Sequence, residues 1–121
     1  MLEAKNIQQF YSGSHILRDV SVSAQAGRVT VLLGRNGVGK TTLLKSLMGL
    51  VPIKSGEIRF DGKTITRATP FTRASMGIGY VPQGREIFPL LTVKENLETG
   101  YAGLKLGDRN IPAYIFELFP V

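Results

Sequence analysis

The chain has 121 residues, a length that fits one domain, and its 43% hydrophobic and 20% charged residues are average for globular proteins. It has no cysteine and a single histidine, which excludes disulfides, thiolate chemistry and metal sites rich in cysteine or histidine. Its 15 basic residues outnumber the 9 acidic ones, and the excess lies in residues 1–85, so we expect an anionic partner.

Three N-terminal segments have the composition of β-strands. Residues 2–10 and 16–24 are predicted to be half-exposed antiparallel strands, because apolar and polar side chains alternate along the second of them. Residues 28–33 are apolar almost throughout and rich in β-branched side chains. This pattern favours a strand covered on both faces, so we expect residues 28–33 at the centre of a sheet.

The middle of the chain is predicted to hold a helix and a hairpin. Apolar residues recur at spacings of three and four after Gly39, which indicates a helix that ends at Gly49. Residues 57–60 alternate and meet an Asp-Gly pair, a strong two-residue turn signal. Residues 63–65 are therefore predicted to return as the second strand of a hairpin.

Three further elements are predicted toward the C-terminus. Residues 77–81 indicate a short strand that a proline stops. Thr92 and Glu95 have the spacing of a capping box, which predicts a helix through Leu97. Pro112 is typical of a helix start. The inner face of this last helix is predicted to hold Tyr114, Ile115 and Leu118.

The motif that carries chemistry follows residues 28–33 directly. Residues 34–41 read Gly-Arg-Asn-Gly-Val-Gly-Lys-Thr and match the P-loop pattern G-x-x-x-x-G-K-[ST] between a predicted strand and a predicted helix. The glycines allow a tight turn whose N–H groups approach phosphate oxygens, Lys40 adds a point charge, and Thr41 offers a hydroxyl to Mg²⁺. The alternative is a glycine-rich loop that merely connects two elements. The residues predicted to bind the nucleotide are Gly34, Asn36, Gly37, Val38, Gly39, Lys40, Thr41 and Thr42.

These residues resemble the ATP-binding subunits of ABC transporters, and the resemblance covers essentially the whole chain. It implies an α/β fold in which residues 1–121 form a partial P-loop NTPase domain with an N-terminal antiparallel β subdomain. Residues 34–42 resemble the Walker A loop, which binds ATP with Mg²⁺. Tyr11 takes the place of the aromatic residue that stacks on adenine, with Phe10 as the competing candidate and a plain strand position as the other alternative.

Residues 80–83, Tyr-Val-Pro-Gln, resemble the Q-loop of the same family. The resemblance implies that Gln83 is a catalytic residue together with Lys40, and that its amide reaches Mg²⁺ and the attacking water. The segment that follows resembles the region that receives the transmembrane subunit. Exposed Phe88 and Leu90 would suit that contact, and core packing is the alternative for each.

A finer resemblance is to the urea-type members of the branched-chain amino acid transporter group, carried by residues 12–18, 34–50, 82–88 and 111–121. It implies import of urea or branched-chain amino acids coupled to ATP hydrolysis. It also implies transmembrane permease partners, a second ATP-binding subunit in a head-to-tail dimer, and a cytoplasmic position at the inner face of the membrane. His15 is expected to be a surface loop residue.

The family's later motifs, including the signature loop and the Walker B strand, do not occur in these 121 residues. Phosphoryl transfer needs several groups at once, so we expect this chain to bind ATP weakly and to hydrolyse it negligibly. Because the family's central sheet includes the Walker B strand, we also expect an unpaired strand edge at residues 28–33 or 77–81. A noncatalytic nucleotide-binding module is therefore the alternative function. The sequence has neither the N-K-x-D motif of a GTPase nor an arginine-rich lid segment, which disfavours a P-loop kinase or GTPase. It also has no interleaved aromatic and basic residues, which disfavours nucleic-acid binding.

Overall fold

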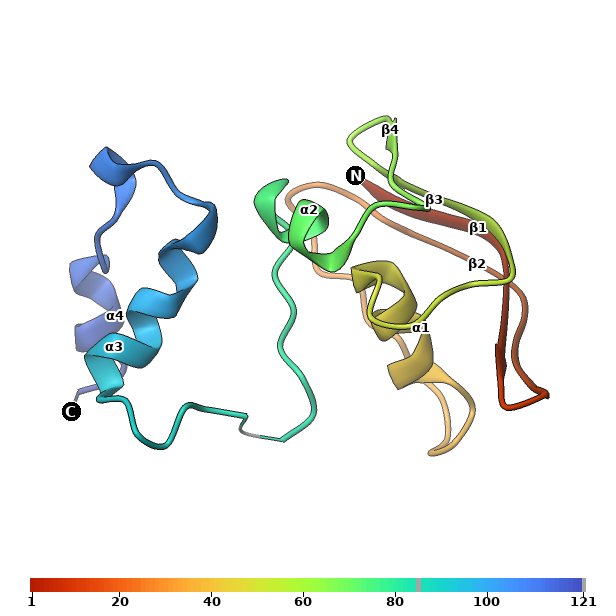
Figure 1. Cartoon of the computed structure of the whole chain (residues 1–121), viewed down its shortest axis with the longest axis horizontal. Coiled ribbons are helices and arrows are strands. Elements are labelled where there is room, and N and C mark those ends of the chain that lie inside the picture. Colours follow the sequence, from red (N-terminus) through yellow and green to blue (C-terminus); the bar gives the residue numbers. More distant parts are fainter. Residues whose placement is uncertain (85, 121) are drawn as a thin grey trace. The chain divides into compact units, whose positions relative to one another are not determined.

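The computed structural model describes residues 1–84 and 86–120, and the chain divides into two units, Met1–Arg73 and Ala74–Val121. The first unit holds a β-sheet and the helix that follows the P-loop, and the second holds short helices (Figure 1). No helix in the described ranges is long and apolar enough to cross a membrane.

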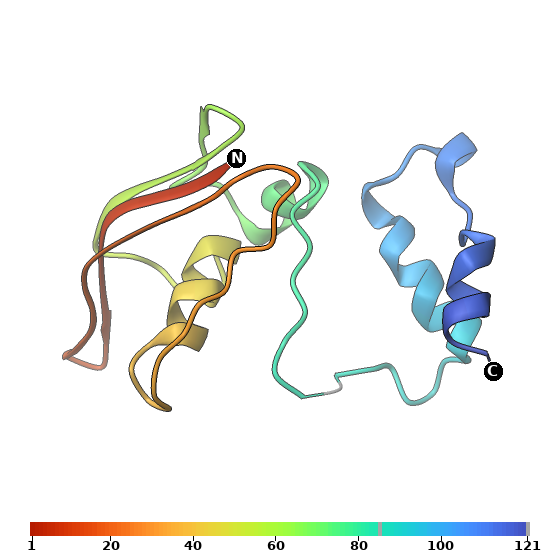
Figure 2. The ribbon, with the colours of Figure 1, turned by 180° about the vertical axis from the view of Figure 1, so that it is seen from behind.

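A four-stranded antiparallel sheet forms the frame of the first unit. Its strands are β1 (Leu2–Tyr11), β2 (Ser14–Ala24), β3 (Ser55–Phe60) and β4 (Lys63–Thr64), in the spatial order β2-β1-β3-β4. β1 therefore lies between β2 and β3, as both views show (Figure 1 and Figure 2). The predicted strands at 2–10 and 16–24 are confirmed. The predicted hairpin is also confirmed, because β3 and β4 turn at Asp61 and Gly62, whose φ angles are 46° and 78°.

β1 and β3 approach each other closely where the register of β1 shifts. The pairing of β1 with β3 is irregular between Lys5 and Gln8, and Asn6 in this interval has a φ of 51°. Gly56 of β3 has a φ of 108°, and a Cβ there would lie 2.7 Å from the carbonyl oxygen of Asn6. Glycine is therefore required at position 56 for the two backbones to meet.

The P-loop helix α1 (Lys40–Met48) completes the hydrophobic core of the first unit. The buried apolar residues of the core are Ala4, Ile7, Leu17, Leu43, Val51, Ile58 and Ile65. α1 ends as predicted at Gly49, which has a φ of 82° and donates its N–H to the carbonyl oxygen of Ser46 at 3.1 Å.

A second helix of this region, α2 (Pro70–Ser75), is absent from the predicted elements. Thr69 begins it, because its Oγ1 accepts the N–H of Thr72 at 3.1 Å and its carbonyl oxygen accepts the N–H of Arg73 at 3.0 Å. Threonine at the N-cap followed by proline at the first helical position is a local start signal. The sequence therefore carried the information for α2, although the helix has only six residues.

The second unit contains two α-helices and two short 3₁₀-helices in its described part. They are α3 (Val93–Glu98), η1 (Thr99–Gly103), η2 (Leu106–Asp108) and α4 (Ala113–Leu118). The predicted capping box is confirmed, since the Thr92 hydroxyl accepts the N–H of Glu95 at 3.2 Å and the Glu95 carboxylate accepts the N–H of Thr92 at 2.7 Å.

α4 begins directly after Pro112, as predicted, but its predicted inner face is wrong. Tyr114 and Leu118 are 56% and 65% exposed, and Ile115 is half-buried. A helix of six residues makes fewer than two turns, so it presents too short a face to bury three side chains.

Neither of the two strands predicted outside the antiparallel sheet forms. Residues 28–33 are not paired in a sheet, and Val29, Val31 and Leu33 are 92%, 68% and 85% exposed. Residues 77–81 are likewise not paired. A strand exists only through hydrogen bonds to a neighbouring strand, and none of the described segments supplies that neighbour to either stretch.

Candidate nucleotide-binding site

The P-loop turns through left-handed backbone conformations at two glycines. Gly37 has a φ of 82° and Gly39 a φ of 103°, values that L side chains rarely adopt. A Cβ on Gly37 would meet nothing within 4 Å, whereas one on Gly39 would lie 3.0 Å from Cδ2 of Leu17 and 3.3 Å from Cγ2 of Ile16. Gly37 is thus needed for its conformation alone, and Gly39 is needed both for its conformation and for packing on β2.

α1 presents free N–H groups at the end of this loop. Gly39 is the N-cap, and the first hydrogen bond runs from the N–H of Leu43 to the carbonyl oxygen of Gly39 at 2.9 Å. The N–H groups of Lys40, Thr41 and Thr42 therefore have no carbonyl partner within the helix. The first turn carries no acidic residue, so the positive end of the helix dipole is uncompensated there. An anion with several acceptor oxygens matches this end of the helix.

The Lys40 ammonium group lies against the beginning of the loop. Nζ donates to the carbonyl oxygen of Gly34 at 2.5 Å and to that of Arg35 at 2.6 Å. Because an ammonium group has three N–H donors, one remains for a further acceptor. The two bonds tie the first residues of the loop to the first residue of α1 and keep a positive charge at the loop.

The hydroxyl of Thr41 fits a magnesium ion that arrives with a nucleotide. Thr41 is exposed at the first turn of α1, and Thr42 is half-buried. Among the described residues, no three His, Cys, Asp or Glu side chains gather to hold a metal ion. Mg²⁺ in phosphate sites typically takes only one or two protein ligands and fills its other positions with phosphate oxygens and water. A single hydroxyl beside the phosphate loop is consistent with that mode of binding.

The two aromatic candidates at the end of β1 differ in their surroundings. Phe10 stacks on His15, with ring centroids 4.1 Å apart and an interplanar angle of 6°, and Lys54 Nζ lies 4.8 Å from the centroid of Phe10. Tyr11 is 52% exposed. His15 was expected in a surface loop, and this is wrong: it is a half-buried residue of β2 whose Nε2 lies 2.6 Å from Oε1 of Gln8.

Tyr11 continues the inner face of β1. Ile7 and Gln9 are 0% and 1% exposed, and side chains two positions apart in a strand share one face. Gln9 pairs with Leu17, and Leu17 is the side chain that contacts the backbone of Gly39. The end of this face therefore belongs to the side of the sheet that carries the P-loop.

The candidate residues of the second unit are exposed. Gln83 lies in a segment without regular secondary structure, and its predicted role beside Mg²⁺ stays a prediction. Phe88 and Leu90 are 56% and 97% exposed, which favours a contact surface over core packing. Asn96 holds this segment, because its side chain accepts the N–H of Phe88 at 2.9 Å and donates to the carbonyl oxygen of Leu91 at 3.1 Å.

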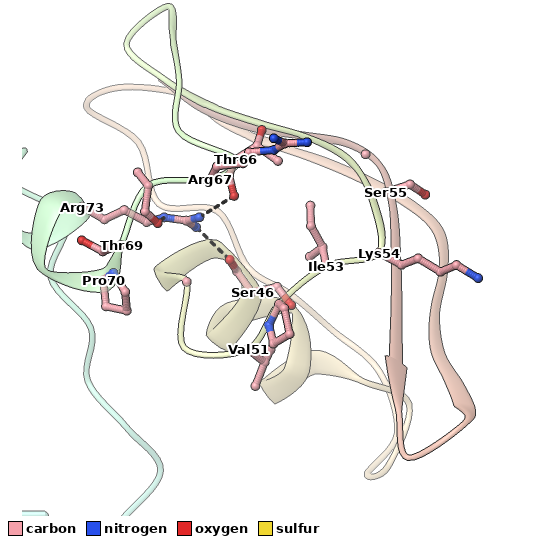
Figure 3. A pocket seen from close by; sticks show the side chains of 14 residues that line it. Ser46, Val51, Ile53, Lys54, Ser55, Thr66, Arg67, Thr69, Pro70 and Arg73 are labelled. Carbon is pink, nitrogen blue, oxygen red and sulfur yellow. Dashed lines mark hydrogen bonds between the residues drawn. The ribbon is translucent and has the colours of Figure 1, made fainter.

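One buried cation of the first unit was not predicted. Arg73 of α2 is 2% exposed and lines a cavity between the C-terminal end of α1, residues 51–56 and residues 66–70. Figure 3 shows its guanidinium directed toward Ser46 and Thr66. Burial lowers the pKa of this guanidinium from its ordinary value. No sequence signal marks a buried arginine, because arginine side chains are mostly exposed.

The glycine loop, the free N–H groups of α1 and the Lys40 ammonium together define a P-loop nucleotide-binding fold. The family model described as ABC transporter matches residues 17–117. The chain therefore belongs to the ABC transporter family.

Curated relatives with this sequence pattern are ATP-binding proteins of transport systems. A probable branched-chain amino acid transport ATP-binding protein of Archaeoglobus fulgidus is 42% identical over 98 residues, which are 81% of this chain and 42% of that protein. A high-affinity branched-chain amino acid transport ATP-binding protein of Pseudomonas aeruginosa is 36% identical over 121 residues, 99% of this chain and 52% of that protein. A lipopolysaccharide export system ATP-binding protein of Escherichia coli is 42% identical over 96 residues, 79% of this chain and 40% of that protein.

Solved structures agree with the fold. A nucleotide-free ATP-binding cassette from an ABC transporter has a TM-score of 0.74 and 30% identity, with 99% of this chain and 46% of that chain covered. A dimeric bacterial ABC transporter cassette has a TM-score of 0.77 at 24% identity, with 95% and 52% covered, and shows the fold alone. The chain thus spans about half the length of the proteins that it matches.

Proposed function

We propose that the chain is the ATP-binding component of an ABC importer for branched-chain amino acids and binds ATP with Mg²⁺ at the P-loop. The observation that carries this proposal is the Lys40 ammonium held at the loop beside the unpartnered N–H groups of α1. Thr41 would ligate Mg²⁺, and Gln83 would reach the metal and the attacking water. The residues proposed to contact the phosphates are Gly34, Asn36, Gly37, Val38, Gly39, Lys40, Thr41 and Thr42.

Tyr11 is the proposed adenine platform. Its ring is half exposed and follows the inner face of β1, whereas Phe10 is already stacked on His15. An aromatic face binds a purine by stacking, which needs an accessible ring. These surroundings favour Tyr11 over Phe10.

Branched-chain amino acids are the proposed cargo of the complete transporter, because two of the relatives above are ATP-binding proteins for their transport. Urea is the second candidate, because several segments of the sequence resemble the urea-type members of the branched-chain amino acid transporter group. Vesicles that contain the complete transporter, with this subunit and its permease, would discriminate the two. ATP-dependent uptake of leucine but not urea supports the first, and the reverse result supports the second.

Permease subunits and a second ATP-binding subunit are the proposed partners. The exposed side chains of Phe88 and Leu90 suit a permease contact at the inner face of the membrane. In a head-to-tail dimer, the signature loop of the second subunit would cover the nucleotide bound at this P-loop.

ATP hydrolysis belongs to the complete transporter in this proposal, and the 121-residue chain binds nucleotide without turnover. In residues 1–73, all of which are described, the four acidic residues lie on β1–β3 or on the hairpin turn. They are Glu3, Asp19, Glu57 and Asp61. None of them belongs to the P-loop or to α1, so residues 34–48 contain no carboxylate that could orient an attacking water. This observation favours the noncatalytic reading for the chain by itself.

Calorimetric titration with MgATP tests the binding function. We expect the wild-type chain to bind, and Lys40→Ala to weaken binding by at least about tenfold, since a charge-assisted contact to phosphate contributes ~1.5–3 kcal/mol. Lys45→Ala removes a second lysine of α1 and is the matched control, which should bind like the wild type. Equal affinities of the wild type and Lys40→Ala would refute the proposal.

A further inference from the structure

The guanidinium of Arg73 joins α2, which carries it, to two other segments of the first unit. It donates to the carbonyl oxygens of Ser46 at 2.9 Å and Leu47 at 2.6 Å in the last turn of α1. It also donates to the carbonyl oxygens of Thr66 and Ala68, each at 3.0 Å, in the segment between β4 and α2. Four of its five N–H donors are thus used, all on backbone carbonyls (Figure 3).

The partners of Arg73 are dipoles, since no carboxylate of the described residues lies within ion-pair distance of it. Carbonyl groups of the last turn of a helix carry the negative end of the helix dipole, which a cation stabilises. The buried charge of Arg73 is therefore balanced by the C-terminal end of α1. Loss of the guanidinium would leave carbonyls of Ser46 and Leu47 without these donors.

Gly49 makes room for this arrangement. A Cβ at Gly49 would lie 3.1 Å from both Cζ and Nε of Arg73 and 3.3 Å from the carbonyl oxygen of Ala68. The residue that ends α1 is therefore also the residue that lets the guanidinium reach the helix end. Gly49 and Arg73 form one cap on α1.

α1 is held at both ends. Its N-terminal end rests on β2, where the backbone of Gly39 contacts Leu17, and its C-terminal end rests on Arg73. A nine-residue helix is a rigid rod about 13 Å long. If its C-terminal end moves while its N-terminal end stays in place, the helix axis tilts and every N–H group along it changes direction. The N–H groups at its first turn are those proposed to meet the phosphates.

We propose that Arg73 is a positioning residue for the nucleotide site, which fixes the direction of α1 and hence of the P-loop N–H groups from the opposite end of the helix. The inference rests on the proposed nucleotide binding at Lys40. Arg73 touches neither the nucleotide nor Mg²⁺ in this scheme. Its effect is geometric, and misplacement of binding groups by a fraction of an ångström weakens oriented contacts.

Arg73→Gln, Arg73→Lys and Gly49→Ala test the proposal, with Arg67→Gln as the matched control. Arg67 is an exposed arginine of the segment before α2, so its substitution removes a charge without touching α1. Two measurements are made on each folded variant: the dissociation constant for MgATP, and the backbone amide resonances of residues 37–42 in ¹H–¹⁵N spectra without nucleotide. Gly49→Ala keeps Arg73, but the added Cβ would push its guanidinium away from the end of α1.

We expect Arg73→Gln and Gly49→Ala to shift the P-loop amide resonances and to weaken MgATP binding about tenfold. Arg73→Lys should not restore either property, because one ammonium group cannot span the four carbonyls. Arg67→Gln should match the wild type. If the resonance changes stay confined to residues near 46–51 and 66–70 and the affinity is unchanged, the proposal is overturned. Loss of folding in all three test variants would also overturn it and leave Arg73 a folding residue.

The two proposals fail in different ways. If the wild type does not bind MgATP, or binds it without dependence on Lys40, the proposed function fails whatever Arg73 does. If binding depends on Lys40 and is insensitive to Arg73, only the positioning role fails.

Discussion

The backbone of Gly39 packs against the side chain of Leu17 so closely that a Cβ at Gly39 would lie 3.0 Å from Leu17 Cδ2. This contact joins Gly39, the P-loop residue that caps the start of α1, to β2. It places the P-loop on the antiparallel sheet at Gly39, a position where a residue with a side chain does not fit. The glycine pattern of the motif therefore serves packing, in addition to the phosphate access that we propose for it.

Gly39→Ala and Gly37→Ala should separate these two roles. Both force an L side chain into a left-handed conformation, which costs about 1–2 kcal/mol, but only Gly39→Ala also presses on Leu17. We expect Gly37→Ala to lower the free energy of unfolding by about 1 kcal/mol and Gly39→Ala by about 2–3 kcal/mol in urea denaturation. Equal losses would show that the contact with Leu17 contributes nothing.

Tyr11→Ala should weaken MgATP binding about tenfold, because stacking of a base on an aromatic ring contributes ~1–3 kcal/mol. Phe10→Ala should leave the affinity near the wild-type value, since Phe10 is stacked on His15. Inorganic triphosphate has no base, so its affinity should be the same for both variants and the wild type. Calorimetry with the two ligands measures both effects. An affinity loss for ATP in Phe10→Ala alone would assign the adenine contact to Phe10.

Val29→Lys should reduce self-association of the chain. Residues 28–33 are unpaired and expose Val29, Val31 and Leu33, and an exposed apolar segment with free backbone groups pairs readily with another chain. We expect sedimentation velocity to show concentration-dependent association of the wild type and at least a tenfold weaker association of Val29→Lys. Leu90→Lys replaces an equally exposed residue of the second unit and should associate like the wild type. A wild-type chain that stays monomeric at high concentration would argue against this surface.

Acidification should weaken the start of α3. Hydrogen bonds from the backbone N–H and the hydroxyl of Thr92 lower the pKa of the Glu95 carboxyl below its ordinary value. The capping box therefore stabilises α3 fully above the ordinary glutamate pKa of about 4.3 and loses that contribution as the pH falls through the lowered value. Amide exchange of residues 95–97 between pH 6 and 3 measures the loss.

Glu95→Gln is the control for this titration, because glutamine keeps the reciprocal hydrogen bonds of a capping box and does not ionise in this range. Its amide protection should stay level where that of the wild type falls. The same decline in both chains would assign the pH dependence to other groups.

Local chemistry in the sequence was sufficient for β1, β2, the β3–β4 hairpin, α1 and the start of α3. The glycine that ends α1, the Asp-Gly turn and the Thr92–Glu95 box act through backbone groups a few residues away, so a short window of sequence contains the whole interaction. The P-loop motif likewise predicted a tight glycine turn, and the structure shows that Gly37 and Gly39 make it in left-handed conformations.

Only the tertiary structure decided the state of residues 28–33 and the place of Arg73. The β-branched composition of 28–33 favours a strand, but a strand exists only where another segment completes its hydrogen bonds, and a window of sequence does not contain that segment. Arg73 lies 26 and 27 residues from the carbonyl groups of α1 that it caps. Hydrogen bonds between segments so far apart in sequence leave no periodic pattern, and the fold alone brings them together.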